Sequence, residues 1–325
     1  MLDCASPPSV DSGSMRGCVF EARDKLAMHQ THDSVRGILW MLLVMLMFAS
    51  MDALAKYLTQ VYPVPEVVWA RYSVHVLLLV LLLNRRIPAL MVTRHLRLQL
   101  LRSLLLFLTT ALFFTGLSHL ALVDASVIMF VSPLIVTALA SPLLGEKVGT
   151  RRWLGVAVGF AGALIVIRPG AGSLHWAAVF PLAAAACYAL YQVATRRLGH
   201  ADSAITTLCY SALFGAVVMS LVVPLVFIMP SLKDGALMLL LGSLGGLGHF
   251  ALIKSLQVAP VSVVAPFGYT SLLWSTTYGY LIFADLPDHW TLLGAFVIIA
   301  SGLYVWHRER VHERRGSAVE SAVSH

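Results

Sequence analysis

RGILWMLLVMLMFASMDALAKYL, residues 36–58, is the first of ten long apolar stretches that fill nearly the whole chain between Ser34 and Trp306. A hydrocarbon core about 30 Å thick requires roughly 20 apolar residues of helix to cross it. The sequence predicts further spans at 66–84, 98–119, 123–144, 153–167, 174–195, 204–229, 236–257, 261–283 and 290–307. The fifth stretch is short, and we expect it to extend at its ends. The pattern predicts an all-α membrane protein with ten transmembrane helices.

Composition leads to the same fold class. The chain is 58% hydrophobic and 12% charged, and its mean hydropathy is +0.81. These values lie far outside the range of soluble globular domains. The net charge of +7 requires no nucleic-acid partner, because most Lys and Arg residues fall in the segments predicted to face the cytoplasm.

The placement of Lys and Arg predicts the orientation, since cytoplasmic loops retain positive charge. With the N-terminus inside, only Arg168 and Lys233 fall in outer loops. The inner segments hold Arg16, Arg23, Lys25, Arg36, Arg85, Arg86, Arg94, Arg97, Lys147, Arg151, Arg152, Arg196, Arg197, Arg308, Arg310, Arg314 and Arg315. An even number of spans also returns the C-terminus to the cytoplasm. We therefore expect a multi-pass protein of a bacterial-type inner (plasma) membrane with both termini cytoplasmic.

The ends of the chain are polar. Residues 1–33 show no periodicity and are predicted to be a disordered cytoplasmic leader, and 308–325 a cytoplasmic tail. No short apolar region followed by a cleavage site precedes the first span, which argues against a cleaved signal peptide. The four cysteines show no paired spacing, so neither a disulfide nor a metal site is expected.

The loops after the fourth and ninth spans share a spacing that indicates an internal repeat. Glu146 precedes Gly155 by the same number of residues as Asp285 precedes Gly294, which gives an offset of about 139 residues. Because each copy holds five spans, an odd number, the second copy must be inverted in the membrane. Inverted repeats recur in secondary transporters, whose binding sites lie at the repeat interface. The predicted units are 34–168 and 169–307; chance recurrence of acidic turns is the simpler alternative.

Motifs in both halves resemble a known family. They are Asp124-Ala125-Ser126, Ser132-Pro133, Gly145-Glu146, Trp153-Leu154-Gly155, Gly159-Phe160-Ala161-Gly162, Ala259-Pro260, Ala265-Pro266-Phe267, Trp290 to Gly294, and Ala300-Ser301-Gly302. Their order over ten spans resembles the EamA-type family of the drug/metabolite transporter superfamily, across about 36–307. The second half departs from the pattern, with Leu272 where Pro133 would recur and Asp285 in place of Glu.

The resemblance implies two inverted five-helix repeats around a central cavity. In that family the cavity is lined mostly by spans 1, 3, 4, 6, 8 and 9, with spans 5 and 10 peripheral. Members resembling this chain move amino acids, nucleoside-like compounds, vitamins and drugs in either direction. The resemblance therefore implies a transporter and leaves its substrate open.

Charged side chains within the first two spans are candidates for substrate or ion handling, because ionisable groups are costly inside a membrane. Asp52 and Lys56 lie four residues apart on one helix face and can pair there, and Arg71 and His75 repeat this spacing. A structural role is the alternative: the first pair neutralises itself, and Arg71 reaches Glu66 or the headgroups. Asp52 is the better functional candidate, since it lies well inside its span.

The eighth span combines glycines with a histidine. Gly242, Gly245, Gly246 and Gly248 favour close helix packing, and His249 follows them. A hydrogen-bonded contact residue is one interpretation of His249, and a proton-linked switch is the other. We interpret Lys254 and Arg102, near the inner ends of their spans, as side chains that extend to the membrane surface.

Aromatic residues in the sixth and ninth spans are candidates for the wall of a ligand cavity. Tyr188, Tyr191 and Gln192 fall on about one helical turn, and Tyr269 and Trp274 lie in the ninth span among hydroxyl side chains. Ligand sites combine aromatic walls with a few polar groups. The mid-span prolines Pro133 and Pro266 interrupt backbone hydrogen bonding and permit bending.

The predicted function is secondary active transport of a small organic metabolite by alternating access, as exporter or importer. The sequence lacks a nucleotide-binding Gly-x4-Gly-Lys-Ser/Thr loop, a His-Glu-x-x-His pair and a Gly-x-Ser-x-Gly elbow. An enzyme is therefore not expected. A membrane-embedded enzyme acting on a lipid-like substrate is the alternative from another class, and a channel is the third.

The expected partners are a small-molecule substrate, a coupling proton and the lipid bilayer, with a homodimer as a further prediction and no cofactor or metal. In-span cationic or titratable groups (Lys56, Arg71, His75, Arg102, His249 and Lys254) outnumber Asp52, which favours a ligand carrying a carboxylate or phosphate. An amino-acid-like or zwitterionic metabolite is the preferred substrate, and riboflavin- or S-adenosylmethionine-type uptake the alternative. Asp52 is the predicted coupling residue.

Overall fold

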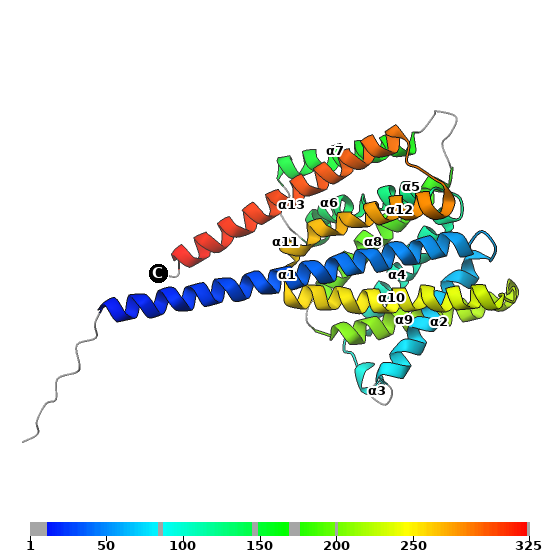
Figure 1. Ribbon diagram of the computed structural model, residues 1–325, viewed down its shortest axis with the longest axis horizontal. Helices are drawn as coiled ribbons and strands as arrows, with labels where there is room; N and C mark the ends of the chain where they lie inside the picture. The colour runs from blue at the N-terminus through cyan, green and yellow to red at the C-terminus, as the bar shows by residue number, and fades with distance from the viewer. Residues whose placement is uncertain (1–11, 84–86, 145–148, 169–175, 199–200, 324–325) are drawn as a thin grey trace, which may run out of the picture.

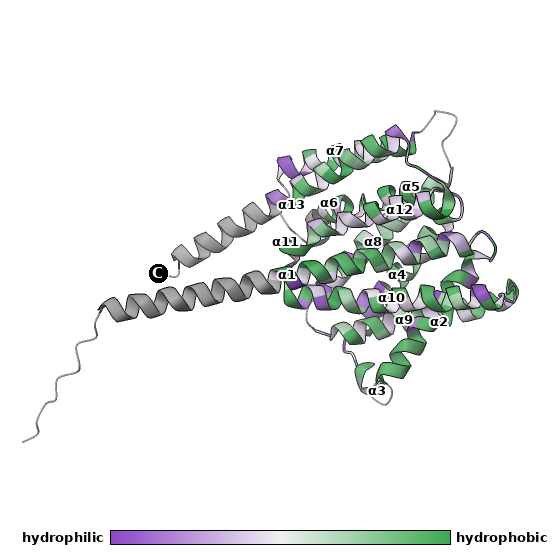
Figure 2. Cartoon of the chain, viewed as in Figure 1, coloured by the Kyte–Doolittle hydropathy of each residue, from purple (hydrophilic) through white to green (hydrophobic). Residues whose placement is uncertain are grey.

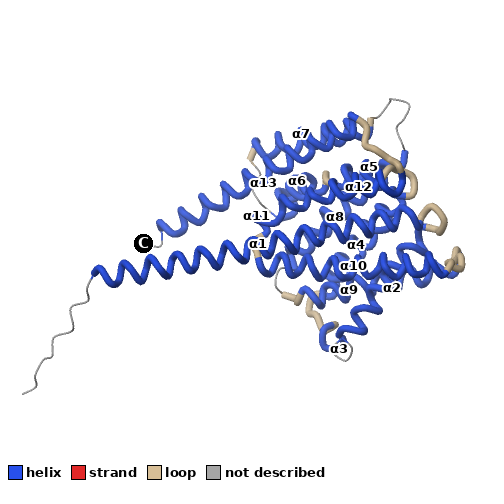
Figure 3. The backbone as a smooth tube through the Cα atoms, viewed as in Figure 1, coloured by secondary structure: helices blue, strands red, loops and turns tan. Residues whose placement is uncertain are grey.

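The computed structural model describes residues 12–83, 87–144, 149–168, 176–198 and 201–323. Within these residues the chain forms helices joined by turns and loops, without a strand (Figure 3). The elements are α1 (Ser12–Leu58), α2 (Val64–Leu83), α3 (Ile87–Leu90), α4 (Leu96–Leu117), α5 (Leu122–Met129), α6 (Ser132–Leu144), α7 (Thr150–Ile167), η2 (Trp176–Ala178), α8 (Val179–Leu198), α9 (Ala204–Val222), η3 (Val223–Leu225), α10 (Leu232–Val258), α11 (Val261–Val264), η4 (Ala265–Thr270), α12 (Ser271–Phe283) and α13 (His289–Val323).

Nine helices in the described part of the chain are long and apolar enough to cross a membrane. They confirm an all-α, multi-pass architecture, and the fifth stretch extends at its start, as expected, to become α7. The predicted ninth stretch, 261–283, is not among the nine, because it is divided into α11, η4 and α12. Pro266 lies within η4; it lacks an N–H group and disfavours continuous α-helix at this point.

The fourth stretch is interrupted in a similar way. Helix α5 ends at Met129, two turn residues follow, and α6 begins at Ser132, directly before Pro133. Proline is tolerated in the first turn of a helix, where its missing N–H has no partner to lose. The two predicted mid-span prolines therefore both lie where a helix changes direction or type.

The helices pack as a bundle in which neighbours are matched between the two halves (Figure 1). Helix α1 packs along α10, and α4 packs along α8. Helix α2 packs on α9 and α10, while α7 and α13 form a pair at one side of the bundle. Hydrophobic residues predominate along the helices of the bundle in Figure 2, as expected for helices that face lipid.

Glycines let α7 and α13 approach closely. A Cβ atom added at Gly155 would lie 2.7 Å from Val305 on α13, and one added at Gly294 would lie 2.4 Å from Val166 on α7. Real Cβ atoms do not approach other atoms so closely, so a larger residue at either position would force the helices apart. At both positions a side chain of one helix packs directly against the glycine backbone of the other.

The N-terminal part of α1 and the C-terminal part of α13 project from the same end of the bundle, which we call the terminal end (Figure 1). Helix α1 begins at Ser12, so residues 12–33 are helical where their composition predicts disorder. The chain has no proline between Pro8 and Pro63 that would interrupt this helix. Residues 1–11 lie outside the described residues.

Candidate functional site

A cavity of about 360 Å³ lies inside the bundle, and we call it the central cavity. Its polar lining comes from α2, α4, α8, α9, α10 and the α8–α9 loop: Arg71, Tyr72, His75, Arg102, Tyr188, Tyr191, Thr195, Asp202, Thr207, Ser211 and His249. Asp202 and Leu256 mark its mouth at the terminal end, where Ser255 also bonds to the Gly37 carbonyl of α1 at 2.8 Å. The cavity therefore extends from the terminal end to the middle of the helices.

Arg102 on α4 is the most extensively bonded group in this wall. Its Nε donates to Thr195 Oγ1 at 2.6 Å and its Nη2 to Tyr191 Oη at 2.6 Å, both on α8. Its Nη1 reaches the Thr207 carbonyl and Ser211 Oγ on α9, at 3.4 and 3.5 Å. Arg102 is 5% exposed, so it does not extend to the membrane surface as the sequence suggests. It ties three helices together around the cavity.

Arg71 on α2 is equally buried but less completely bonded. Its Nε approaches Met51 Sδ at 3.4 Å, and its Nη1 donates to Thr110 Oγ1 at 2.9 Å. Its Nη2 has no hydrogen bond within the described part of the chain. Arg71 also does not pair with Glu66, whose Oε2 accepts from the backbone N–H of Ile228 at 3.0 Å. The guanidinium therefore keeps unused hydrogen-bonding capacity beside the cavity.

The structure brings His75 and His249 together, as the sequence does not predict. Their rings are stacked with centroids 6.1 Å apart and an angle of 11° between the planes. His249 also meets the edge of Phe48 at 5.1 Å. The Nε2 atom of His75 is enclosed and has no hydrogen-bond partner among the described residues. Both imidazoles line the central cavity.

Tyr188 and Tyr191 form an aromatic wall on α8. Their rings stack with centroids 5.6 Å apart and planes 18° from parallel. Both predicted tyrosines line the central cavity, whereas Gln192, next to them, does not. The two tyrosines are three positions apart on α8, which places their side chains on one helix face.

Four other predicted site residues lie elsewhere. Tyr269 packs on Phe130, and Trp274 is likewise absent from the cavity lining. Asp52 and Lys56, both on α1, also contribute nothing to that lining. Lys56 does not pair with Asp52, because its Nζ meets Asp285 Oδ2 at 3.1 Å and the Leu120 carbonyl at 2.8 Å. The carboxyl of Asp52 is instead attracted by Arg71, without an ion pair between them.

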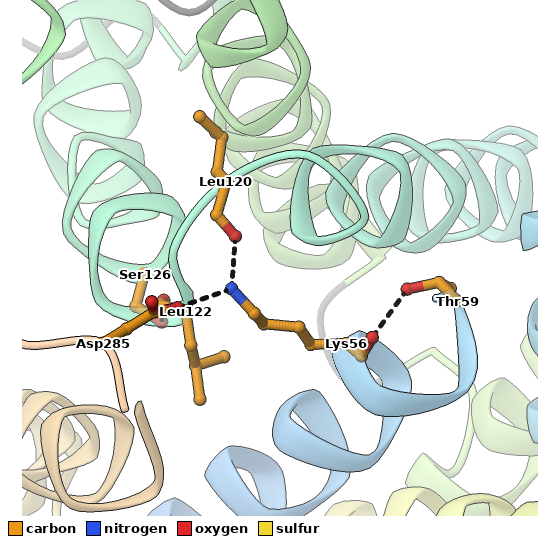
Figure 4. Close-up of polar contacts among 6 residues, drawn as sticks. All are labelled: Lys56, Thr59, Leu120, Leu122, Ser126 and Asp285. Carbon is orange, nitrogen blue, oxygen red and sulfur yellow. Dashed lines mark hydrogen bonds and ion pairs between the residues drawn. The ribbon is translucent and has the colours of Figure 1, made fainter. Parts of the chain in front are cut away.

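Lys56 lies in the last turn of α1, at the end of the bundle opposite the terminal end, which we call the closed end (Figure 1). The Lys56 side chain is 8% exposed and that of Asp285 is 40% exposed. The lysine also lies 4.9 Å from the ring of Phe283. One ammonium thus joins α1 from the first half to the loop after α12 in the second half, and to the turn that follows α4 (Figure 4).

Further polar contacts join the two halves at the closed end. Tyr62 Oη donates to Asp234 at 2.9 Å, and Arg168 pairs with Asp288 at 2.7 Å. Burial opposes ionisation of Asp288, but hydrogen bonds from Thr291 and the charge of Arg168 outweigh it and lower the pKa of this carboxyl. Both contacts connect a residue of the first half to one of the second.

The mouth at the terminal end has a different carboxylate. Asp202 Oδ2 accepts from Thr93 Oγ1 at 2.6 Å and from Gln99 Nε2 at 2.8 Å. The hydrogen bond from Thr93 lowers the pKa of Asp202, and the bond from Gln99 adds to this against a weaker effect of burial. Asp202 therefore remains ionised near neutral pH while already engaged by two donors.

Sequence reasoning missed the polar face of α4. Gln99, Arg102, Ser103, Thr109 and Thr110 are all buried in the bundle. Their spacing follows a helical period, so one polar stripe on an otherwise apolar span is a signal that could have identified Arg102 as inward-facing.

The expected lining also needs correction: spans 2 and 7 (α2 and α9) contribute to the cavity, while spans 1, 4 and 9 provide none of its described lining residues. The packing of α2 against α9 and α10 explains this difference.

With this geometry established, comparison with known proteins decides the family. The model of the EamA-like transporter family matches the chain twice, over residues 35–168 and 175–306. The chain belongs to the EamA-like transporter family. Its resemblance to the drug/metabolite transporter superfamily is thereby confirmed, and the alternative of a membrane-embedded enzyme is set aside.

Several curated relatives match this chain over most of its length. An S-adenosylmethionine uptake transporter of Rickettsia bellii is 31% identical over 274 residues, which cover 84% of this chain and 94% of that protein. A riboflavin transporter of Vibrio cholerae is 28% identical, with 87% and 97% covered. A pseudopaline exporter of Pseudomonas aeruginosa is 27% identical, with 82% and 94% covered.

A solved crystal structure supports the fold. It superposes with a TM-score of 0.62 and 16% sequence identity, and the match covers 85% of this chain and 98% of the other. At this identity the likeness concerns the arrangement of helices only.

Proposed function

We propose that this EamA-like transporter is a secondary carrier that moves a small organic metabolite by alternating access through the central cavity. The observation that carries the proposal is the difference between the two ends of the bundle. The cavity reaches the terminal end at Asp202 and Leu256, whereas the closed end is bridged by Lys56 and Asp285. A site reached from one side and sealed at the other is what one state of an alternating-access carrier requires.

The proposed architecture is two inverted repeats of five spans, 34–168 and 169–307. The tenth span would be 261–283, which crosses as α11, η4 and α12. Helix contacts support the symmetry, because Gly155 contacts Val305 as Gly294 contacts Val166. Each member of the second contact lies 139 positions from its counterpart in the first, in agreement with the predicted offset. The double match of one family model supports the same division.

The proposed orientation places the terminal end, and with it the cavity mouth, in the cytoplasm of a bacterial-type cell. The basic residues Arg151, Arg152, Arg196 and Arg197 flank helix ends on the predicted inner side, and positive charge is retained there. The state described is then open inward and closed outward. The direction of net transport depends on the driving gradient and is compatible with either an exporter or an importer.

The test is a reversible lock at the closed end. Cysteines in place of Lys56 and Asp285, in a background with the native cysteines replaced, can be joined by a short bifunctional thiol reagent. The expected result is loss of counterflow in proteoliposomes on cross-linking and its recovery on reduction. Labelled riboflavin and S-adenosylmethionine serve as the first probes, since relatives carry these names.

Each alternative predicts another outcome of this experiment. A channel would equilibrate label without exchange against unlabelled compound. An enzyme would release a modified product without exchange. Counterflow that continues at full rate in the cross-linked protein would contradict alternating access through this end. The single variants Lys56→Cys and Asp285→Cys, treated with the same reagent, control for modification without bridging.

Proton coupling through Asp52 remains a proposal. The attraction between Asp52 and Arg71 connects this carboxyl to the cavity wall without occupying it in an ion pair. If Asp52 couples transport to protons, the Asp52→Asn variant should reach the membrane normally and exchange substrate. It should lose substrate accumulation driven by a pH gradient. Unchanged pH-driven accumulation would remove Asp52 from the mechanism and turn attention to His75 or His249.

A further inference from the structure

The two arginines of the central cavity are buried and neither forms an ion pair in the described part of the chain, although the Asp52 carboxyl attracts Arg71. Arg71 and Arg102 are each 5% exposed, and no carboxylate in the described part of the chain forms an ion pair with either. Asp202, the carboxylate in the cavity lining, is bonded to Thr93 and Gln99 at the mouth. Two buried guanidiniums without an ion-pair partner are costly, and an anionic ligand would offset that cost.

The two guanidiniums have different tasks. Arg102 directs its bonds to protein groups, so it fixes α4, α8 and α9 and supplies charge. Arg71 retains Nη2 for a ligand, and a guanidinium binds carboxylate or phosphate oxygens through parallel N–H bonds. The binding contact is therefore expected at Arg71, with Arg102 as a positioning residue.

Tyr191 offers a second donor. Its oxygen accepts from Arg102 Nη2 at 2.6 Å, which leaves the phenolic hydrogen free to be donated. Arg102 also lies over the Tyr191 ring at 4.5 Å. A hydroxyl that accepts from a cation becomes a stronger donor, because hydrogen bonds in a chain polarise one another.

The rest of the cavity suits a flat ring with a polar edge. The stacked Tyr188 and Tyr191 present an aromatic surface, and aromatic rings favour offset or edge contacts with other rings. His75 adds an enclosed nitrogen, Nε2, that has no partner among the described residues although its ring lines the cavity. Such a group is satisfied when a ligand bonds to it.

We propose that the central cavity binds an oxyanion, a carboxylate or a phosphate, that is joined to a flat ring. The oxyanion contacts Arg71 and the Tyr191 hydroxyl, and the ring lies against Tyr188 and Tyr191. This inference rests on the proposed transport function for its physiological meaning, but the binding site can be tested separately. No unengaged carboxylate in the described lining is available to an ammonium group, so a cationic ring compound should bind poorly.

The test uses four probes with one ring system: 2-naphthoate, 2-naphthyl phosphate, the neutral 2-naphthamide and the cationic 2-naphthylmethylamine. Binding to the purified full chain is measured by titration calorimetry, with detergent micelles alone as the blank. At least one of the two anions should bind roughly tenfold or more tightly than the amide, which has nearly the shape of the carboxylate. The tighter of the two anions identifies the oxyanion. Equal binding of all four, or tightest binding of the amine, would overturn the proposal.

Three variants locate the site. Arg71→Gln should reduce anion binding to the level of the amide, and Tyr191→Phe should reduce it several-fold. Lys254→Gln is the matched control, because it removes a positive charge from α10 at a residue outside the cavity lining, and it should bind as the wild type does. Full anion preference in Arg71→Gln would contradict the assignment. If this variant fails to fold, the wild-type series and Tyr191→Phe still decide the question.

The same preparation separates this inference from the proposed function. Anion binding without counterflow of any probe, under conditions in which the protein is reconstituted intact, would contradict transport and leave the anion site standing. Counterflow with a preference for the cationic probe would contradict the anion site and leave transport standing.

Discussion

Cations at the closed end form ion pairs with carboxylates, whereas the arginines of the central cavity form hydrogen bonds with uncharged groups only. Lys56 pairs with Asp285 and Arg168 with Asp288, while Arg71 and Arg102 are held by hydroxyls, a thioether and a backbone carbonyl. A pair neutralised within the protein can hold two halves together without a ligand. A buried charge left without a counter-ion is suited to a ligand that brings one.

The largest effect is expected from removing the most extensively bonded cavity cation. Arg102→Met eliminates the bonds to Thr195, Tyr191 and the α9 groups, and hydrogen bonds to a charged group contribute about 1.5–3 kcal/mol each before compensation. Counterflow should fall more than tenfold, and thermal stability measured by fluorescence-detected size exclusion should decrease by several degrees. Lys254→Met is the control for charge on a neighbouring helix. A normal transport rate in Arg102→Met would show that the cavity charge is dispensable.

A smaller effect should follow from unpairing the closed end. Asp285→Asn removes the carboxylate partner of the buried Lys56 ammonium and leaves the Leu120 carbonyl and the Phe283 ring beside it. The partly exposed position of Asp285 limits the loss to about 1 kcal/mol. Maleimide labelling of a cysteine at buried Ser126, close to Lys56 in Figure 4, should then rise roughly fivefold.

The matched double variant sharpens this prediction. Lys56→Met removes the cation, whereas Asp285→Asn leaves it buried without a carboxylate partner. In the double variant, the cysteine at Ser126 should therefore be labelled more slowly than in Asp285→Asn alone. Faster labelling of the double variant would mean that the ammonium itself keeps the closed end shut, with the carboxylate contributing little.

Removing the Tyr62–Asp234 hydrogen bond at the closed end should increase labelling less than Asp285→Asn does. Tyr62→Phe removes the bonds from Tyr62 to Asp234 and from the Ser231 N–H to Tyr62, but Asp234 keeps its bond from Ser231 Oγ at 2.7 Å. The expected change is about 0.5 kcal/mol, or roughly a twofold rise in Ser126→Cys labelling. An effect larger than that of Asp285→Asn would place the main seal at α10 and not at Lys56.

The smallest effect is expected from lowering the pH, which changes the contribution of Asp202 at the cavity mouth to stability. The folded-state pKa of Asp202 is lower than its unfolded value, so its stabilising contribution is present above the unfolded pKa and is lost as the pH falls through the folded pKa. Between pH 8 and 5 the carboxylate stays ionised. The stability difference between wild type and Asp202→Asn should therefore be constant in that range and narrow only at lower pH. A change centred near pH 6 would instead implicate a histidine.

Much of the fold could be predicted because a membrane demands long apolar helices. The span from 98 to 119, for example, differs from α4 by two residues at each end. The division of 261–283 could not be predicted by hydropathy, because its residues stay apolar through the break. Apolar composition indicates the solvent around a segment, whereas the path of its backbone depends on Pro266 and on packing.

The site was less predictable, since contacts between spans decide it. Tyr188, Tyr191, Arg71, His75 and His249 were chosen as in-span polar groups, and they do line one cavity. The pairing of Lys56 with Asp52 that their spacing allows does not occur, because spacing along one helix indicates only which residues can pair. Asp285 lies 229 positions away, and sequence spacing gives no sign of that approach.

The close contact between α7 and α13 has a consequence for how the protein is made. Gly155 and Gly294 bring together two helices that are synthesised far apart in time, because α8, α9, α10 and α12 are made between α7 and α13. Until then the glycine face of α7 has only lipid to cover it, in a membrane where small residues pack poorly against acyl chains. A nascent chain that ends before His289 presents this uncovered face to the proteases that survey the membrane.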